Sequence, residues 1–142
     1  KREMYYRQFI DKALKGEPIE IWGNAKKVKE IVYVKDFVQI VECCVKATID
    51  GGFYNVGEEE CVSLDEQIKG TIDVFCEEDN KSPIIYRPEM PDPSEFVFDI
   101  SKTKKELGYK PQFNYRAALE DLKKEMLANP FEKLWGREED YR

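Results

Sequence analysis

The chain has 142 residues and a formal net charge of −6, with 23 basic and 29 acidic side chains. This length suffices for one ordinary domain with a buried core. The acidic balance argues against a protein that binds nucleic acid or a membrane surface, and no apolar run approaches the roughly 20 residues that span a bilayer.

Residues 1–49 predict two helices and two short strands. The first helix ends at Gly16 and Pro18, and strands are expected over 19–22 and 31–34. Asp36 has the position of an N-cap for the second helix. The apolar residues that define the two helices by their spacing are Tyr6, Phe9, Ile10, Ala13 and Leu14, then Phe37, Ile40, Val41, Cys44, Val45 and Thr48.

Residues 51–98 predict three strands around one helix. A buried strand is expected over 53–56, and further short strands over 84–86 and 96–98. Ser63 and Glu66 have the spacing of a capping box, which marks the start of the helix. Its apolar face carries Leu64, Ile68, Ile72 and Phe75.

Two further helices are expected after residue 98. A short one starts at Asp99 or Ser101 and stops at Gly108. Asn114 caps the second, which ends before Pro130. Its apolar face carries Tyr115, Ala118, Leu119, Leu122 and Met126.

Strands and helices mix without a strict βαβ order, so the pattern leaves α/β and α+β open. We expect one domain, followed by a charged and aromatic tail over residues 131–142. The helical pattern already includes residues 1–3, and no signal-peptide pattern opens the chain. This predicts that the chain is a fragment that begins inside a larger structure.

Several kinds of site are excluded by residue type. The chain contains no histidine, so Ser-His-Asp and Cys-His chemistry cannot be built from it alone. Its cysteines lack the C-x-x-C spacing of a zinc site. Cys44 falls on the apolar side of a predicted helix, which indicates a buried, reduced thiol in a cytoplasmic protein. The run Glu58-Glu59-Glu60 predicts an exposed turn.

Three landmarks in sequence order resemble one family. They are the junction over 31–37, the strand and turn over 53–57, and the pair of segments DISK (99–102) and LGYKP (107–111). They resemble the C-terminal, substrate-binding half of an extended short-chain dehydrogenase/reductase of the NAD-dependent nucleotide-sugar epimerase/dehydratase family, over residues 4–126. The resemblance implies a partial architecture of that family, with short strands and about five helices. Residues 1–130 would form the substrate-binding region.

Two features of the family have no match in this chain. The eight glycines form no G-x-x-G-x-x-G set, the turn that cradles the NAD pyrophosphate at a helix end in the Rossmann domain. No tyrosine is followed four residues later by the lysine of the catalytic Tyr-x-x-x-Lys pair. The resemblance therefore implies that NAD belongs to the missing N-terminal cofactor domain of a longer parent, an isomerase or lyase. The fragment alone is expected to bind no cofactor and no metal, and to be inactive.

The resemblance also implies which residues contact a nucleotide-sugar. The family carries a basic residue that contacts the diphosphate at the position of Lys29, and lysine would supply a point charge there in place of an arginine fork. The alternative is that Lys26, Lys27 and Lys29 form a solvated loop. Arg87 lies upstream of the position at which the family has a second anion-binding arginine, and it would take that role after an adjustment of the loop. The alternative is a strand-end arginine in a surface ion pair.

Trp22 and Tyr33 are candidates to flank the base or the sugar, because aromatic faces stack on flat or C–H-rich groups. Their strand positions equally suit packing in the core. The candidate substrate-binding residues are therefore Lys29, Arg87, Trp22 and Tyr33, with no catalytic, cofactor-binding or metal-binding residue.

Three functions remain open. The first is the substrate-binding part of an epimerase or dehydratase that transiently oxidises a sugar with NAD. The others are a non-catalytic binding or regulatory module, and a reductase of the same family acting on another hydroxy or keto substrate. We expect residues 37–48 and 53–56 to expose apolar surface that meets the cofactor domain. Alone, the chain should therefore form a homo-oligomer.

Overall fold

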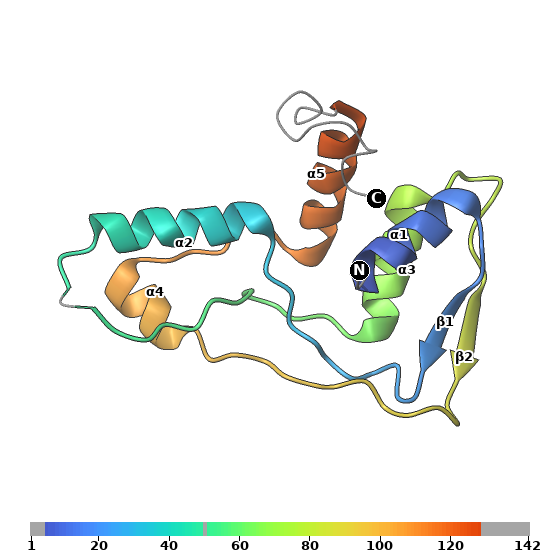
Figure 1. Ribbon diagram of the computed structural model, residues 1–142, viewed down its shortest axis with the longest axis horizontal. Coiled ribbons are helices and arrows are strands. Elements are labelled where there is room, and N and C mark those ends of the chain that lie inside the picture. The colour runs from blue at the N-terminus through green and yellow to red at the C-terminus, as the bar shows by residue number, and fades with distance from the viewer. Residues whose placement is uncertain (1–4, 50, 129–142) are drawn as a thin grey trace, which may run out of the picture.

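The computed structural model describes residues 5–49 and 51–128 of the chain. These residues form five helices and one two-stranded sheet, which agrees with the expected mixture of about five helices and short strands (Figure 1). The elements in chain order are α1 (Tyr5–Lys15), β1 (Ile19–Trp22), α2 (Val34–Lys46), α3 (Leu64–Phe75), β2 (Ile84–Arg87), α4 (Ser101–Leu107) and α5 (Tyr115–Ala128). Residues 1–3, Pro130 and the expected tail over 131–142 lie outside the described residues.

One group of elements, the sheet lobe, consists of β1, β2, α1, α3 and α5. The two strands are parallel, with Ile19 opposite Ile84 and Trp22 opposite Arg87. The helices α1 and α3 pack on β1 and on each other, and α5 packs on α3. The core of this lobe is mostly apolar, with Ala13, Ile19, Ile21 and Ile68 among its most deeply buried residues, and α3 adds the buried polar side chains of Gln67 and Thr71.

The capping box expected at the start of α3 is confirmed, because both of its hydrogen bonds are present. The Ser63 side chain accepts a hydrogen bond from the Glu66 N–H, and the Glu66 carboxylate accepts one from the Ser63 N–H. The capping expected at Asn114 is also present, because its Oδ1 accepts from the Ala117 N–H at 2.9 Å. Gly108 ends α4 with a φ of 68°, in the left-handed region that glycine tolerates best.

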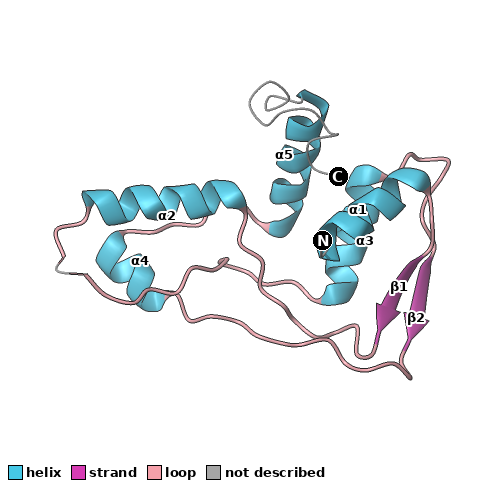
Figure 2. Cartoon of the chain, in the orientation of Figure 1, coloured by secondary structure: helices cyan, strands magenta, loops and turns pink. Residues whose placement is uncertain are grey.

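The second group of elements, the helix lobe, consists of α2 and α4. Its small core contains Ile40, Ile100, Leu107 and Tyr109. Figure 2 shows that long extended connections, drawn in pink, join this lobe to the sheet lobe. The lobe therefore depends on these connections as well as on its own few apolar contacts.

Glu30 ties three of the extended connections together. Its carboxylate accepts hydrogen bonds from the Glu58 N–H at 2.8 Å and from the Phe98 N–H at 2.5 Å, and the side chain is 6% exposed. Gly57 is required beside it, because a Cβ at that position would lie 1.7 Å from Glu30 Oε1. One buried carboxylate thus holds the three segments together by hydrogen bonds to their backbone, in the absence of a continuous strand ladder between them.

The strands expected over 31–34, 53–56 and 96–98 are wrong. Among the described residues, the segment 96–98 takes part only in an isolated bridge between Lys29 and Phe96, and the segments 31–34 and 53–56 take part in no strand or bridge. Val34 already belongs to α2, and Phe53 is 98% exposed instead of buried. A strand needs a neighbour with which to form a ladder, and the described part of the chain supplies none here.

Three expectations about single residues are also corrected. Asp36 does not cap α2, whose N-cap is Tyr33. It lies buried in the first turn and accepts from the backbone N–H groups of Gln112 and Phe113. Cys44 is exposed because its face of α2 is uncovered, and Glu58 is buried instead of lying in an exposed turn.

Candidate functional site

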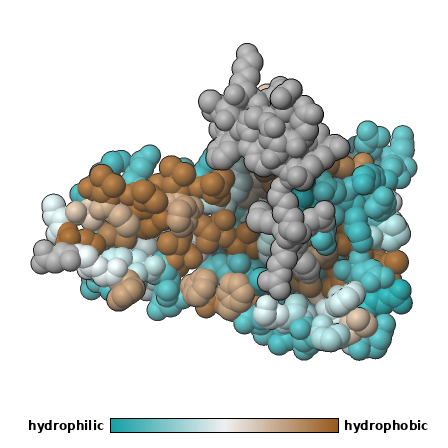
Figure 3. Space-filling model, in the orientation of Figure 1, coloured by the Kyte–Doolittle hydropathy of each residue, from teal (hydrophilic) through white to brown (hydrophobic). Residues whose placement is uncertain are grey.

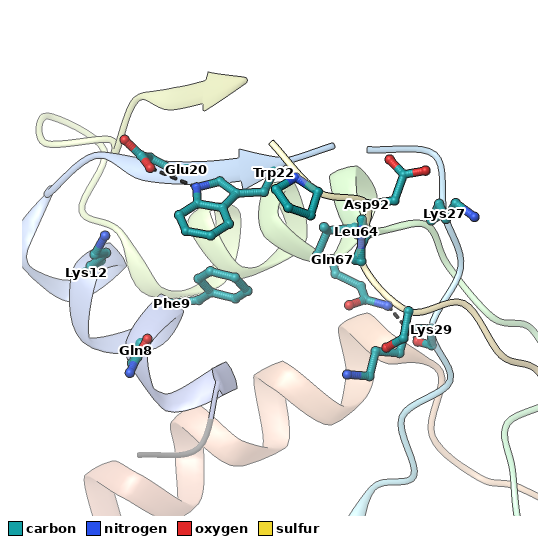
Figure 4. Close-up of a pocket in the computed structure, with 13 residues that line it drawn as sticks. Gln8, Phe9, Lys12, Glu20, Trp22, Lys27, Lys29, Leu64, Gln67 and Asp92 are labelled. Carbon is teal, nitrogen blue, oxygen red and sulfur yellow. Dashed lines mark hydrogen bonds between the residues drawn. The ribbon is translucent and has the colours of Figure 1, made fainter. Parts of the chain in front are cut away.

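A pocket of about 620 Å³ opens in the sheet lobe, beside the end of β1 (Figure 4). Its walls come from α1, β1, the start of α3, the loop after β1 that contains Lys27 and Lys29 (the lysine loop), and the loop after β2 that contains residues 91–94 (the acidic loop). Because β1 and β2 are parallel, both loops leave the sheet at the same edge. The fold thereby brings together residues that are far apart in the sequence.

An aromatic wall forms one side of the pocket. Trp22 is the last residue of β1 and is 48% exposed, so its role is not the core packing that its strand position also suited. Its Nε1 donates a hydrogen bond to Glu20 Oε2 at 2.9 Å, which fixes the plane of the ring. Phe9 of α1 lies across from it in Figure 4. A flat group could stack on this wall.

The carboxylate that holds Trp22 is itself held by two donors. The hydrogen bond from Trp22, and then the bond from Arg87 at 3.2 Å, lower the pKa of Glu20 below its ordinary value. Glu20 therefore stays ionised at neutral pH, and both partners stay in place. Arg87 forms this surface ion pair and is not among the residues that line the pocket.

Lysine side chains from the lysine loop and from α1 contribute positive charge to the lining of the pocket. Lys12, Lys27 and Lys29 line it, whereas Lys26 is exposed and does not. The Lys27 Nζ pairs with Glu95 at 3.3 Å. The Lys29 Nζ lies 5.7 Å from the centroid of the Phe96 ring, within the range of a cation–π contact. The lining thus carries three cations beside the carboxylates of Glu20 and Asp92, and cations in a pocket attract an anionic ligand.

The acidic loop closes the rim opposite α1. Asp92 Oδ1 accepts a hydrogen bond from the Asn24 N–H at 2.8 Å. Gly23 is needed at this contact for two reasons. It has a φ of 64°, and a Cβ on it would lie 2.6 Å from the Asp92 Cα. The turn after β1 and the loop after β2 are thus locked together at the pocket.

Gln67 of α3 lies at the base of the pocket and is 1% exposed. Its Nε2 donates to the backbone oxygen of Lys29 at 2.9 Å and to that of Val62 at 3.0 Å. Its Oε1 is buried and has no hydrogen-bond partner among the described residues. The side chain therefore fixes the backbone of Lys29 and leaves one acceptor unsatisfied.

Tyr33 lies outside the pocket, at the start of α2. Its hydroxyl donates to Asp121 Oδ2 at 2.6 Å, and its ring contacts Phe113 with the centroids 4.9 Å apart. Burial, and then the hydrogen bond to Asp121, raise the pKa of Tyr33 to about 12. Of the four candidate binding residues, the structure brings Trp22 and Lys29 together in the pocket, and places Arg87 and Tyr33 elsewhere.

Sequence reasoning missed several residues that line the pocket, notably Phe9, Lys12, Gln67 and Asp92. Phe9 falls on the apolar face of α1, where a core role is the simplest interpretation. Gln67 did carry a signal, because a polar residue interrupts the apolar face between Leu64 and Ile68.

The described residues offer little for other kinds of site. No group of three or more His, Cys, Asp or Glu side chains among them could hold a metal ion, and the cysteines in this part are free. None of the helices described is long and apolar enough to cross a membrane. The positive-φ glycines of this part lie in turns and at helix ends, and none forms a cradle for a dinucleotide between a strand and a helix.

Comparison of the sequence with known proteins identifies one family. The model of the NAD dependent epimerase/dehydratase family matches residues 2–57. The chain is 30% identical over 118 residues to dTDP-glucose 4,6-dehydratase of Xanthomonas campestris pv. campestris (strain B100). The matched region covers 78% of this chain and 34% of that protein. The chain is also 29% identical over 114 residues to UDP-glucuronic acid decarboxylase 2 of Arabidopsis thaliana, covering 24% of it.

Solved structures share the fold. UDP-N-acetylglucosamine 4-epimerase from Bacillus cereus matches with a TM-score of 0.73 and 21% identity, over 94% of this chain and 43% of that one. Epimerase Mth375 from Methanothermobacter thermautotrophicus matches with a TM-score of 0.76 and 20% identity, over 91% and 38%. The chain thus spans about a quarter to a third of the length of the two curated relatives named above.

Proposed function

This chain belongs to the NAD-dependent epimerase/dehydratase family, and from this we propose that it is the nucleotide-sugar-binding part of such an enzyme. The pocket beside Trp22 is the proposed site. The proposal rests on one observation: a stackable indole and the Lys29 cation line the same pocket.

A nucleoside diphosphate matches this combination. Its base is flat and can stack on the aromatic wall, and its diphosphate needs fixed positive charge. The names of solved relatives support the ligand class. One is a UDP-glucose 4-epimerase from Thermotoga maritima solved with UDP-glucose, and another a UDP-glucuronic acid 4-epimerase from Bacillus cereus solved with UDP-glucuronic acid and NAD.

The role proposed for this chain is to bind and orient. Interactions with the nucleotide, remote from the reacting carbon, would hold the sugar in place for chemistry performed elsewhere. NAD, when bound to the parent protein, supplies reversible hydride transfer. The pocket contains no histidine and the described residues show no dinucleotide cradle, so we assign NAD and catalysis to the remaining length of the parent.

The curated relatives support a proposal about the class of ligand better than one about the reaction. The curated relatives include a dehydratase, a decarboxylase and, from Escherichia coli, a dTDP-4-dehydro-6-deoxyglucose reductase. Their names share a nucleotide-linked sugar and differ in the chemistry. We therefore extend the nucleotide-sugar, and no single reaction, to this chain.

The partner that we propose for the chain is a cofactor domain that covers α2. The outer face of α2 is apolar and exposed, and Figure 3 shows hydrophobic side chains gathered along it. The expectation of exposed apolar surface is confirmed at Phe37, Val41, Val45 and Phe53. The length of the relatives leaves room for a domain to cover this face, and a homo-oligomer formed through it remains a proposal.

Calorimetric titration with UDP-glucose tests the proposed function. Lys29→Ala should weaken binding by about 1.5–3 kcal/mol, as expected when one partner of a charge-assisted contact is removed. Lys26→Ala is the matched control, and its effect should stay within about 0.5 kcal/mol because Lys26 is exposed outside the pocket. The loss at Lys29 should shrink as salt rises, and Lys29→Arg should be tolerated.

Two results would contradict the proposal at different levels. Equal, small effects at both lysines would remove Lys29 from the site. Absence of binding by UDP-glucose, UDP and dTDP alike would overturn the nucleotide-sugar function itself.

A further inference from the structure

We propose that Gln67 selects the ligand: its Oε1 accepts a hydrogen bond from an N–H or O–H group of the bound nucleotide. This inference rests on the proposed function and assigns a specificity-determining contact within that site.

The orientation of the amide is fixed by its nitrogen. Both Nε2 protons are used by backbone oxygens, those of Lys29 and Val62. A rotation of the amide by 180° would place its oxygen against these two acceptors, so Oε1 must point the other way. In Figure 4 the Gln67 oxygen points to the open side of the pocket that Phe9 faces.

The acceptor is buried and unsatisfied. Gln67 is 1% exposed, and Oε1 has no partner in the part of the chain that the structure describes. The nearby hydroxyl of Thr71 is committed, because it donates to the Gln67 backbone oxygen at 2.8 Å. Buried polar atoms are nearly always paired, and an unpaired one costs about 1–3 kcal/mol. A donor from outside the protein would remove that cost.

The chemistry of an amide oxygen narrows the kind of donor. It accepts from a neutral N–H or O–H and carries no net charge, so it does not repel a diphosphate held near Lys29. A uracil or thymine nucleotide offers such donors in two places, the imide N–H of the base and the free hydroxyls of the pentose, which number two in UDP and one in dTDP. Both have the chemistry that Gln67 requires.

The test is a cycle of ligand and side-chain changes, measured as dissociation constants. UDP is compared with N3-methyl-UDP, 2′-deoxy-UDP and 3′-deoxy-UDP, each of which lacks one donor. The unmodified protein should bind one of the three about tenfold more weakly than UDP. Gln67→Leu should bind UDP about tenfold more weakly, with no further loss for that analogue. The analogue concerned identifies the base or the ribose as the source of the donor.

A purely structural role gives a different pattern. If Gln67 only holds the Lys29 backbone, Gln67→Leu will weaken all four ligands by the same factor and discrimination will persist, which overturns the inference. Equal binding of all four ligands by the unmodified protein overturns it as well. Absence of UDP binding to the unmodified protein overturns the proposed function with it.

A second measurement needs no substitution. The carbonyl ¹³C resonance of the Gln67 side chain in the unmodified protein should shift on addition of UDP, and shift less with the analogue that lacks the donor. This keeps the inference testable if Gln67→Leu fails to fold. An identical shift with all four ligands counts against it.

Discussion

Glu58 is buried near two other carboxylates, where three extended segments meet. Burial, and then the charges of Glu30 and Asp36, raise the pKa of Glu58 from its ordinary value of 4.5 to about 7. Because the folded pKa is the higher one, the fold favours the protonated form. This contribution to stability is complete below about pH 4.5 and is lost as the pH rises through 7.

Glu58→Gln should therefore raise the free energy of unfolding at pH 8 by about 1 kcal/mol and change it little at pH 4.5. Glutamine keeps the shape of the side chain and cannot ionise. Urea denaturation at the two pH values measures the difference. Glu60→Gln, at an exposed neighbouring position, is the matched control and should show no pH-dependent gain. An equal gain in both variants would point to net charge instead of burial.

Substitutions of Tyr33 and Trp22, the two aromatic candidates for the binding site, should affect different properties, namely stability and the affinity for UDP. Tyr33→Phe removes the hydrogen bond to Asp121 and should lower stability by about 1 kcal/mol, with the affinity for UDP unchanged. Trp22→Ala should lower the affinity by about 1–3 kcal/mol, the worth of one base stacked on an aromatic ring. Thermal denaturation and calorimetry on the same samples decide this. A loss of UDP affinity in Tyr33→Phe would place that residue in the site after all.

Among the elements, α3 depends most visibly on its cap. Ser63→Ala removes the side-chain half of the capping box and should cost about 1 kcal/mol in the free energy of unfolding. Because α3 carries Leu64 and Gln67 into the pocket, UDP should restore part of the lost stability. Ser63→Thr retains a capping hydroxyl and should stay close to the original protein. Unchanged stability in Ser63→Ala would show that packing alone holds the start of the helix.

The helices could be predicted from the sequence because their signals are local. The caps at Ser63 and Asn114, the end at Gly108 and the apolar spacing of α1 each lie within a few residues of the element that they define. Strands are different, since a ladder needs a second segment. Residues 53–56 have the composition of a buried strand, yet Phe53 is 98% exposed, and these residues form no ladder with any other described part of the chain.

The site was predictable to the same extent. Trp22 and Lys29 could be predicted because they lie close together in the sequence, at the end of β1 and in the loop that follows it. Gln67 and Asp92 reach the pocket only through tertiary structure, because α3 and the loop after β2 pack against that loop. The interrupted apolar face of α3 marks Gln67 as a polar residue in a buried position, but nothing local in the sequence indicates that it meets Lys29.

At the scale of the whole molecule, the exposed face of α2 predicts association. Val41→Lys should weaken self-association of the isolated chain by placing a charge at the centre of the apolar face, where Val41 is 50% exposed. Val97→Lys is the matched control, since Val97 is 59% exposed on the connection between β2 and α4. Sedimentation equilibrium over a range of concentrations measures the effect. A monomer at every concentration would contradict the prediction.

The two lobes are interleaved along the chain, and this has a consequence for biosynthesis. Ile19 of β1 pairs with Ile84 of β2, and α2 of the other lobe is made between them. A ribosome that adds about 5–20 residues per second needs roughly 3–13 s to synthesise the intervening chain. During that time α1 and β1 exist without β2, and for most of it also without the complete helix α3. The nascent polypeptide therefore passes through a period of exposed apolar surface in which chaperone binding competes with misassembly.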